Sequence, residues 1–388
     1  MYEPREDSYL LKKHIKDYAR GDVLEIGTGS GILAKETSNY SEKVIAVDID
    51  KEAIKYAIKH SNNPNISYLY SDMFQNVKDK FDLIICNPPY LPTNEKAPDT
   101  ALDGGKKGWE WSEKFLSQAN NFLKTDGKIL FLFSSLTNKD KIDELIFKYG
   151  FESKKIDEEK LFFEKLYVYL LEKTRLTKEL ESKKITNISY FSKGRRGVVW
   201  KAKWKHKDVI IKSTNPNSTA FNRIQNEINI LNRLNKQFNN KNIAKGLSPK
   251  ILFHGDNYFA YTFIDGIFFQ DYIKKEKKMR IKKVLNKLFD KLYALDEFRL
   301  NKCEMTRPIK HILIENNTPY LIDFERAVFT ENPKNVSQFV QFLLSKNILH
   351  LLENKGFKID KERVRNVVII YKKNINKKDL YCIKKCFK

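Results

Sequence analysis

The sequence predicts an α/β protein, with a doubly wound, mostly parallel sheet in its first half and a two-lobed α+β domain in its second half. Short apolar runs alternate with segments of helical periodicity in the first half, as βαβ units require. A glycine-rich turn joins the first apolar run to a helix, which is where such a sheet binds its ligand. The length of 388 residues is long for one core, so we expect two domains, over residues 1–173 and 174–388.

The elements of the first half follow one another in chain order. A helical pattern comes first, with apolar positions at Leu10, Leu11 and Ile15. Further helices are expected from about Ile32 and over residues 51–59. Because strands and helices alternate, the sheet should be mostly parallel. Strands are expected at residues 23–26, 44–47, 66–70 and 81–86, and two more, at 128–133 and 162–171, should close the sheet.

The turn after the first strand reads Glu25-Ile26-Gly27-Thr28-Gly29-Ser30-Gly31. Glycines at alternate positions let the backbone pass tightly from strand to helix and approach a ligand closely. Ile32 stands where the dinucleotide-binding fingerprint needs its third glycine, so the turn is of another kind. The carboxylate of Glu25, two residues before the first glycine, suits a cationic ligand better than a pyrophosphate. S-adenosylmethionine carries an ammonium and a sulfonium group, and its charge fits.

Carboxylates also follow the next two strands. Asp48 lies about 20 residues past the glycine turn, where a carboxylate can accept both ribose hydroxyls of a nucleoside. Asp50 is expected to cap the helix that follows. Asp72, between Ser71 and Met73 after the third strand, can accept a hydrogen bond from an adenine amino group.

The first half is organised around its fourth strand and the corner Asn87-Pro88-Pro89-Tyr90. The apolar run Phe81 to Cys86 suits a strand buried on both faces of a parallel sheet. Two prolines end it, because neither can donate to a β ladder. The stiff turn places the Asn87 side-chain oxygen beside the Pro88 carbonyl. Two fixed acceptors can hold a substrate NH2 group, and Tyr90 offers a flat apolar face for stacking.

Together these motifs resemble the HemK-type class I methyltransferases, and more narrowly the short archaeal and eukaryotic branch that methylates the glutamine of the Gly-Gly-Gln loop in class 1 release factors. The resemblance also rests on Glu3-Pro4-Arg5-Glu6-Asp7 and on the Asp103-Gly104-Gly105 loop, and it covers essentially all of residues 1–173. It implies a class 1 release factor as substrate and a small zinc-binding activator subunit as partner. It implies that the acceptor amide is positioned by Asn87, Pro88, Pro89 and Tyr90. It implies that S-adenosylmethionine is bound by Glu6, Asp7, Glu25, Gly27, Thr28, Gly29, Gly31, Asp48, Asp72, Met73 and Asn87.

The expected reaction is an in-line displacement at the sulfonium methyl group. An amide nitrogen is a poor nucleophile, so most of the rate must come from alignment and from restricting amide resonance. No strong general base is required. The same tetrapeptide also serves adenine N6-methyltransferases, whose acceptor is another planar NH2 group, so RNA or DNA is the alternative substrate.

The second half opens with a candidate phosphate-binding hairpin. Gly194 and Gly197 flank its tip, Val199 follows two residues later, and Lys212 lies on the next strand. This spacing predicts a loop that covers nucleotide phosphates and a lysine that pairs with them. Glu227, on a helix expected over about residues 220–234, is the natural ion-pair partner of Lys212.

Over about residues 186–330 this half resembles the RIO-like atypical serine/threonine kinases of archaea. Asp323 ends a short apolar strand where kinases place a metal ligand, and His311 occupies the metal-binding Asn position. The resemblance therefore implies ATP, with Mg at Asp323 and His311. Thr306 stands where the catalytic Asp belongs, and Glu304 is the only nearby carboxylate that could replace it. A kinase, an ATPase-type switch and an ATP-dependent ribonucleoprotein-binding module all remain open.

Composition limits the partners and the compartment. Residues 1–173 carry 26 Lys and Arg against 29 Asp and Glu, whereas residues 174–388 carry 46 against 20. The basic second half indicates a surface that meets RNA or the ribosome. Four scattered cysteines cannot form a disulfide framework, which favours a reducing cytoplasm. No apolar run approaches the ~18 residues that span a bilayer, and no signal-peptide pattern opens the chain, so no membrane contact is expected.

Overall fold

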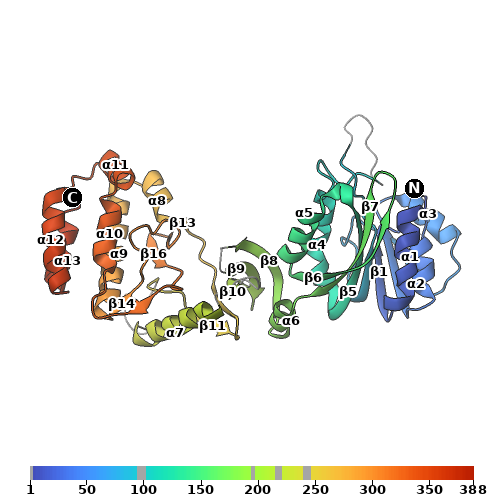
Figure 1. The fold of residues 1–388 in the computed structure, drawn as a ribbon, viewed down its shortest axis with the longest axis horizontal. Coiled ribbons are helices and arrows are strands. Elements are labelled where there is room, and N and C mark those ends of the chain that lie inside the picture. Colours follow the sequence, from blue (N-terminus) through green and yellow to red (C-terminus); the bar gives the residue numbers. More distant parts are fainter. Residues whose placement is uncertain (1–2, 94–101, 194–196, 215–220, 239–245) are drawn as a thin grey trace. The chain divides into compact units, whose positions relative to one another are not determined.

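The computed structural model describes residues 3–93, 102–193, 197–214, 221–238 and 246–388 (Figure 1). Contacts divide the chain into two compact units. The first comprises Met1–Phe191 and Trp200–Lys207, and the second comprises Ser192–Val199 and Asp208–Lys388. Among the helices in these described ranges, none is both long and apolar enough to cross a membrane.

Helices and strands largely alternate through the first unit, as the sequence predicts, although some strands follow one another without a helix between them. In order the elements are α1 (Glu6–Tyr18), β1 (Asp22–Ile26), α2 (Ile32–Ser38), β2 (Lys43–Asp48), α3 (Lys51–Lys59), β3 (Ile66–Tyr70), β4 (Phe81–Cys86), α4 (Glu110–Phe122), β5 (Leu123–Ser134), the short 3-10 helix η1 (Ser135–Thr137), α5 (Lys139–Lys148), β6 (Phe151–Lys160), β7 (Lys165–Lys173) and α6 (Arg175–Ser182). The strands β8 (Ile185–Lys193) and β9 (Gly197–Trp204) come next, and the division between the units falls at these two strands.

In the described part of the first unit, one seven-stranded sheet has the order β3-β2-β1-β4-β5-β7-β6. The strands from β3 to β5 in this order pair in parallel, and β7 and β6 add antiparallel ladders at one edge. The chain fills the sheet outward from β1 to β3 and then returns to place β4 on the other side of β1. The connections that leave β1 and β4 therefore run in opposite directions. This is a topological switch point, where a crevice opens at the carboxyl ends of the strands.

The central strand β4 is buried on both faces, as the sequence predicts. Leu83 and Ile85 pack in one cluster with apolar side chains of α1 and α2, whereas Ile84 and Cys86 pack in another with side chains of α4 and α5. All four have at most 1% of their surface exposed. Leu83, Ile84 and Ile85 each contribute about 1.5–3 kcal/mol when buried, so β4 is firmly held in the core of the unit.

The edge of this sheet differs from expectation. Strand β6 has no counterpart in the sequence prediction, because its residues are mostly polar and exposed and show no apolar alternation. Phe162 and Phe163, expected inside a strand, lie instead in the turn between β6 and β7. Their exposed fractions are 92% and 86%, so the turn places two aromatic rings in solvent.

The second unit combines short antiparallel strands with longer helices. Its elements are β10 (Lys207–Thr214), α7 (Phe221–Phe238), β11 (Ile251–His254), β12 (Tyr258–Thr262), β13 (Ile267–Phe268), α8 (Phe269–Lys275), α9 (Lys278–Glu297), β14 (Leu300–Asn301), β15 (Ile312–Glu315), β16 (Thr318–Leu321), β17 (Val328–Phe329), α10 (Asn335–Leu343), α11 (Lys346–Asn354), α12 (Lys361–Lys373) and α13 (Lys377–Lys385). Strands β10, β12 and β11 form successive antiparallel ladders. The hairpin of β15 and β16 pairs Ile312 with Leu321, so the residues just outside its open end, His311 and Asp323, lie close together.

Candidate active site

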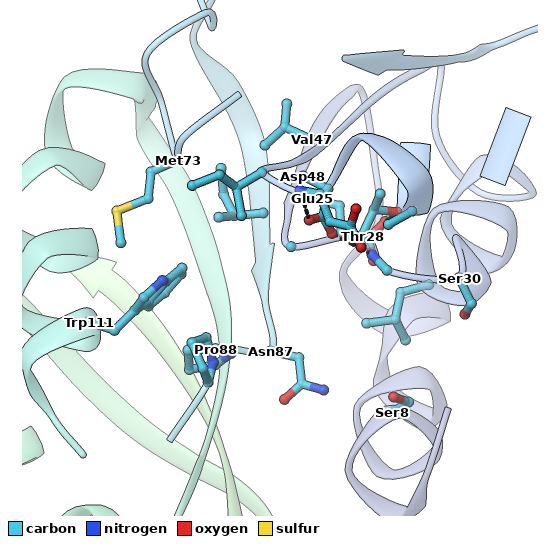
Figure 2. A pocket seen from close by; sticks show the side chains of 18 of the residues that line it. Ser8, Glu25, Thr28, Ser30, Val47, Asp48, Met73, Asn87, Pro88 and Trp111 are labelled. Atoms are coloured by element: carbon cyan, nitrogen blue, oxygen red, sulfur yellow. Dashed lines mark hydrogen bonds between the residues drawn. The ribbon is translucent and has the colours of Figure 1, made fainter. Parts of the chain in front are cut away.

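A cavity of about 200 Å³ lies at the switch point of the first unit (Figure 2). Ile26 of β1 pairs with Cys86 of β4, so the glycine turn and the double-proline corner leave the sheet side by side. The approach is close: a Cβ added to Gly27 would lie 3.9 Å from the main-chain oxygen of Asn87.

Most residues that the sequence and the resemblance nominated line this cavity. They are Asp7, Glu25, Gly27, Thr28, Gly29, Asp48, Asp72, Met73, Asn87, Pro88, Pro89 and Tyr90. Two nominated residues lie outside the lining. Glu6 is exposed in the first turn of α1, and Gly31 is the N-cap residue of α2.

Glycine is needed where the turn enters α2. Gly31 has a φ of 78°, in the left-handed region that disfavours residues with a side chain. A Cβ there would also lie 3.1 Å from the Tyr68 hydroxyl and 3.2 Å from the Ala57 Cβ. Substitution would therefore strain the backbone and push the helix away from its neighbours.

Glu25 is a buried carboxylate with one unused oxygen. Thr28 Oγ1 donates to Glu25 Oε2 at 2.7 Å, whereas Glu25 Oε1 is buried and accepts no hydrogen bond from the residues described. Burial, and to a smaller extent the nearby Asp48 carboxylate, raises the pKa of Glu25 to about 8. A buried acceptor of this kind is costly unless a donor or a cation reaches it. It therefore fits the ammonium group of a cationic ligand.

Asp48, at the end of β2, forms a hydrogen bond with the glycine turn. The backbone N–H of Gly29 donates to Asp48 Oδ2 at 2.8 Å, and the backbone N–H of Asp50 donates to Oδ1 at 2.9 Å. Burial raises the pKa of Asp48, although these two hydrogen bonds favour the ionised form. Each carboxylate oxygen can accept a second hydrogen bond, which leaves room for ribose hydroxyls. Asp50 caps α3 as predicted, accepting from the backbone N–H of Glu52 at 2.9 Å.

The far end of the cavity lies after β3. Met73 has a left-handed backbone, with a φ of 50°, and it lies with Trp111 of α4 at the same end of the cavity (Figure 2). Lys114 Nζ donates to both oxygens of Asp72 at 3.0 Å. Sequence reasoning missed Trp111 and Lys114, because nothing in their helical pattern indicates that α4 reaches β3.

The Asn87 side chain has a defined orientation. Its Nδ2 donates to Asp7 Oδ2 at 3.0 Å, and Asp7 Oδ1 accepts from the backbone N–H of Ser8 at 2.6 Å. Asn87 Oδ1 is buried and receives no hydrogen bond within the described ranges. The amide is therefore anchored by its donor end, and its acceptor oxygen is left free to accept from a ligand. Asp7, nominated for the cofactor, is the side chain that sets this orientation.

A glycine loop packs directly on the double-proline corner. A Cβ on Gly104 would lie 2.8 Å from the Pro89 carbonyl oxygen, and one on Gly108 would lie 2.8 Å from that of Tyr90. The backbone N–H of Gly104 donates to the carbonyl of Leu91 at 2.8 Å. The loop can approach this closely only because both positions lack side chains.

A second cluster of charged side chains lies within the second unit. Lys212 Nζ lies 2.6 Å from Glu227 Oε2 and 2.8 Å from Asp323 Oδ1. The predicted ion pair of Lys212 and Glu227 is therefore present. Burial works against the charge of Lys212, but the two carboxylates raise its pKa. For Asp323, burial opposes ionisation, yet the Lys212 ammonium lowers the pKa to about 2. Lys212 and Asp323 are thus held in their ionised forms, whereas burial raises the pKa of Glu227.

The structure describes only part of the predicted phosphate-binding hairpin. Gly197 lies beside the lysine, since a Cβ added there would be 3.8 Å from Lys212 Cε. Val199 lies in β9. Gly194 lies outside the described residues.

Glu304 and His311 lie next to Asp323. His311 Nδ1 is 3.3 Å from Glu304 Oε2 and 3.7 Å from Asp323 Oδ2. Burial and the positive charge of Lys302 lower the pKa of His311 to about 4. Lys302 is completely buried, donates from Nζ to the Asp323 carbonyl at 2.6 Å, and has its pKa lowered by burial to about 8. Sequence reasoning missed Lys302, because a single lysine after a two-residue strand carries no signal.

The fold and the cavity define a methyltransferase of the doubly wound α/β class. The family model for the methyltransferase small domain matches residues 6–154. A Methanocaldococcus jannaschii protein, provisionally named a protein N5-glutamine methyltransferase, is 40% identical in an alignment of 176 positions that covers 43% of this chain and 89% of that protein. The chain therefore belongs, through its first unit, to this family of S-adenosylmethionine-dependent methyltransferases.

Two more distant similarities cover the same part of the chain. A Lactococcus lactis release factor glutamine methyltransferase is 35% identical over 136 residues, 31% of this chain and 49% of that protein. The solved E. cuniculi Mtq2–Trm112 complex, described as responsible for methylation of the eRF1 translation termination factor, matches 45% of this chain and 98% of its own. Its identity is 20% and its TM-score 0.38.

Proposed function

We propose that the first unit transfers a methyl group to the N5 nitrogen of a protein glutamine, with a class 1 release factor as substrate. The observation that carries this proposal is the buried Oδ1 of Asn87, a residue that lines the cavity, to which no described residue donates a hydrogen bond. Relatives with related sequences are named for the same reaction on glutamine. An acceptor oxygen at this position suits a hydrogen-bond donor such as a neutral NH2 group and disfavours a carboxylate, which can only accept.

The residues present fit S-adenosylmethionine, which supplies the electrophilic methyl group when bound. Glu25, with its unused buried oxygen, would hold the ammonium group of the methionine part. Asp48 would accept from the ribose hydroxyls, and Met73 and Trp111 would flank the adenine. Asp72 would accept from the adenine amino group, as the sequence suggests, while sharing its carboxylate with Lys114.

The acceptor amide would be held by the chain's own oxygens. Asn87 Oδ1 would accept one N–H of the glutamine, and the Pro88 carbonyl would accept the other. Two acceptors on one nitrogen increase its electron density and fix its direction of approach, which is what a weak nucleophile lacks. Asp7 would act as a positioning residue, because it holds Asn87 and not the substrate.

The test is transfer of a labelled methyl group to purified release factor, with the intact chain and with or without a small zinc-binding activator. We expect the label on the glutamine of the Gly-Gly-Gln loop, and we expect Asn87→Ala to reduce transfer by about a hundredfold. Asn121→Ala, an exposed change on α4, is the matched control and should keep full activity. Label on RNA or DNA adenine instead, or full activity of Asn87→Ala, would refute the proposal.

A second candidate function rests on the second unit. We propose that it binds ATP, and the ion pair of Lys212 and Glu227 next to Asp323 is the observation that favours this. Nucleotide binding to wild type and to Asp323→Ala, followed with a fluorescent ATP analogue, tests it. Equal affinity of the two proteins would remove the proposal. Phosphate release and autophosphorylation in the same pair would distinguish an ATPase from a kinase.

A further inference from the structure

Three side chains of different chemistry converge at the open end of the hairpin formed by β15 and β16. His311 precedes β15 and Asp323 follows β16, and the backbone N–H of Ile322 donates to the His311 carbonyl at 3.0 Å, which holds the two ends together. Glu304 comes from the segment after β14. A histidine, a glutamate and an aspartate from three segments thus face one another.

The spacing of their ligand atoms matches the first coordination shell of a divalent ion. His311 Nδ1, Glu304 Oε2 and Asp323 Oδ2 all lie within 4.8 Å of one another. The two shorter separations are 3.3 Å and 3.7 Å. Ligands bound about 2.0–2.2 Å from a metal ion lie roughly 3–3.6 Å apart, so only small side-chain movements would close the shell.

Two of the three facing atoms have no hydrogen-bond partner among the described residues. Asp323 Oδ1 is engaged by Lys212, and Glu304 Oε1 lies 3.7 Å from Arg326 Nε. In contrast, Glu304 Oε2 and His311 Nδ1 are buried and form no hydrogen bond with any part of the chain that the structure describes. Two electron-rich atoms 3.3 Å apart and shielded from water are unfavourable until a cation lies between them.

The charged side chains around these three residues, together with the imidazole nitrogen, determine which kind of cation the cluster would bind. Lys212 and Lys302 contact Asp323 from its other sides, so they offset much of the negative charge that attracts a hard ion such as Mg2+. An imidazole nitrogen binds Mn2+, Co2+ and Zn2+ well and Mg2+ poorly. The affinity of this site would therefore come from its nitrogen ligand more than from its net charge.

We propose that Glu304, His311 and Asp323 form a one-ion site for a divalent first-row transition metal, filled in preference to Mg2+ and without a nucleotide. Glu304 is then a metal ligand and not a free catalytic base. The site lies wholly in the second unit and does not depend on methyl transfer.

The test measures metal binding by the intact chain after removal of metal with a chelator. Titration with Mn2+, followed by loss of the free-ion electron paramagnetic resonance signal, should show one bound ion per chain. That ion should survive a ~100-fold excess of Mg2+. Co2+ should give a visible absorption spectrum characteristic of a nitrogen and oxygen shell. No saturable Mn2+ binding, or complete displacement by that excess of Mg2+, would overturn the proposal.

Substitutions of the individual side chains test which of them bind the metal ion. Glu304→Gln should weaken Mn2+ binding by about tenfold or more, as loss of a ligand or its supporting group does. His311→Asn keeps an oxygen donor and should abolish the preference for Mn2+ over Mg2+. His254→Asn, at an exposed position in β11, is the matched control and should bind as wild type does. Unchanged Mn2+ affinity in both site variants would overturn the assignment, and the Co2+ spectrum of wild type decides the matter if a variant fails to fold.

Discussion

Asp7 and Asn87 are 80 residues apart in the chain, and they share a hydrogen bond of 3.0 Å from Asn87 Nδ2 to Asp7 Oδ2. This bond fixes the orientation of the Asn87 amide and leaves Oδ1 without a partner among the described residues. Without it the amide could turn over and present a donor where the proposed function requires an acceptor. The first helix of the unit therefore sets the chemistry at the end of the fourth strand.

Replacing Asp7 by alanine should reduce kcat for methyl transfer by about 10-fold to 100-fold, because the acceptor is no longer aligned. Asp7→Asn keeps an oxygen that can accept from Asn87 Nδ2 but places its NH2 group against the backbone N–H of Ser8, so it should restore part of the rate. S-adenosylmethionine affinity, measured by calorimetry, should change by less than about twofold in both variants. A large loss of cofactor affinity in Asp7→Ala would instead assign Asp7 to the cofactor, as the family resemblance implies.

Cofactor binding should depend on pH through Glu25. Its pKa of about 8 means that the free protein holds this carboxyl protonated at neutral pH, whereas a bound ammonium group favours the ionised form. Binding should therefore release a proton below about pH 8, and affinity should rise with pH up to that value, by at most about tenfold per unit.

Calorimetry in buffers of different ionisation enthalpy measures that proton directly. Glu25→Gln should bind more weakly and lose the pH dependence between pH 6 and pH 8. A wild-type affinity that stays constant over this range would show that Glu25 does not pair with the ammonium group.

Gly104→Ala should disturb the acceptor side of the site without unfolding the sheet. Its methyl group would overlap the Gly108 carbonyl oxygen of the same loop and would lie 2.8 Å from the Pro89 carbonyl oxygen, so the loop must rearrange against the double-proline corner. We expect the free energy of unfolding to fall by about 1–3 kcal/mol and KM for the acceptor protein to rise. Chemical denaturation and steady-state kinetics measure the two effects. An unchanged KM would show that the loop does not support the corner.

Lys212→Met should strongly destabilise the second unit. Removing this buried cation leaves the Glu227 and Asp323 carboxylates unpaired, a change that costs about 3–5 kcal/mol. Lys274→Met is the matched control: Lys274 pairs with Asp271 at the surface, where both side chains are 53% exposed, and its loss should cost less than about 1 kcal/mol. Differential scanning calorimetry of the intact chain compares them, and equal melting curves would contradict the prediction.

The basic second half should bind ribosomes or RNA in a salt-dependent way. Affinity should fall steeply between ~50 and ~200 mM salt, as counterion release requires, and the slope should decrease when exposed lysines of α12 and α13 become glutamine. Co-sedimentation with ribosomes measures this, with Asn87→Ala expected to bind as wild type does. The lysines to replace are Lys372, Lys373, Lys377 and Lys378, and the control set in the first unit is Lys51, Lys59, Lys106 and Lys154. If both sets of substitutions reduced ribosome binding equally, the second unit would have no special role in that binding.

The sheet, and the side of the cavity formed by the glycine turn and Asp48, could be predicted closely from the sequence. Strand β4, the glycine turn, Asp48 and the Asp50 cap are local features, in which each side chain's role depends on its immediate neighbours in the chain. Their positions in the structure agree with those expected. The pairing of Lys212 with Glu227 was also foreseeable, because each lies at a characteristic place in its element.

The contacts that sequence reasoning missed are all tertiary. Lys114 on Asp72, Trp111 in the cavity and Lys302 on Asp323 each join elements whose contact no local pattern encodes. Strand β6 was missed for a different reason. It is polar and lies at the edge of the sheet, so pairing with β7 determines its conformation and hydrophobic alternation does not.

The pairing of Ile26 with Cys86 has a consequence for how this protein could fail. Side chains alternate between the two sides of a strand, so a slip of β4 by one residue against β1 would turn Asn87 away from the cavity. Such a molecule could remain compact and helical and still be unable to transfer a methyl group. For this fold, activity is therefore a more sensitive reporter of correct strand alignment than compactness or helix content.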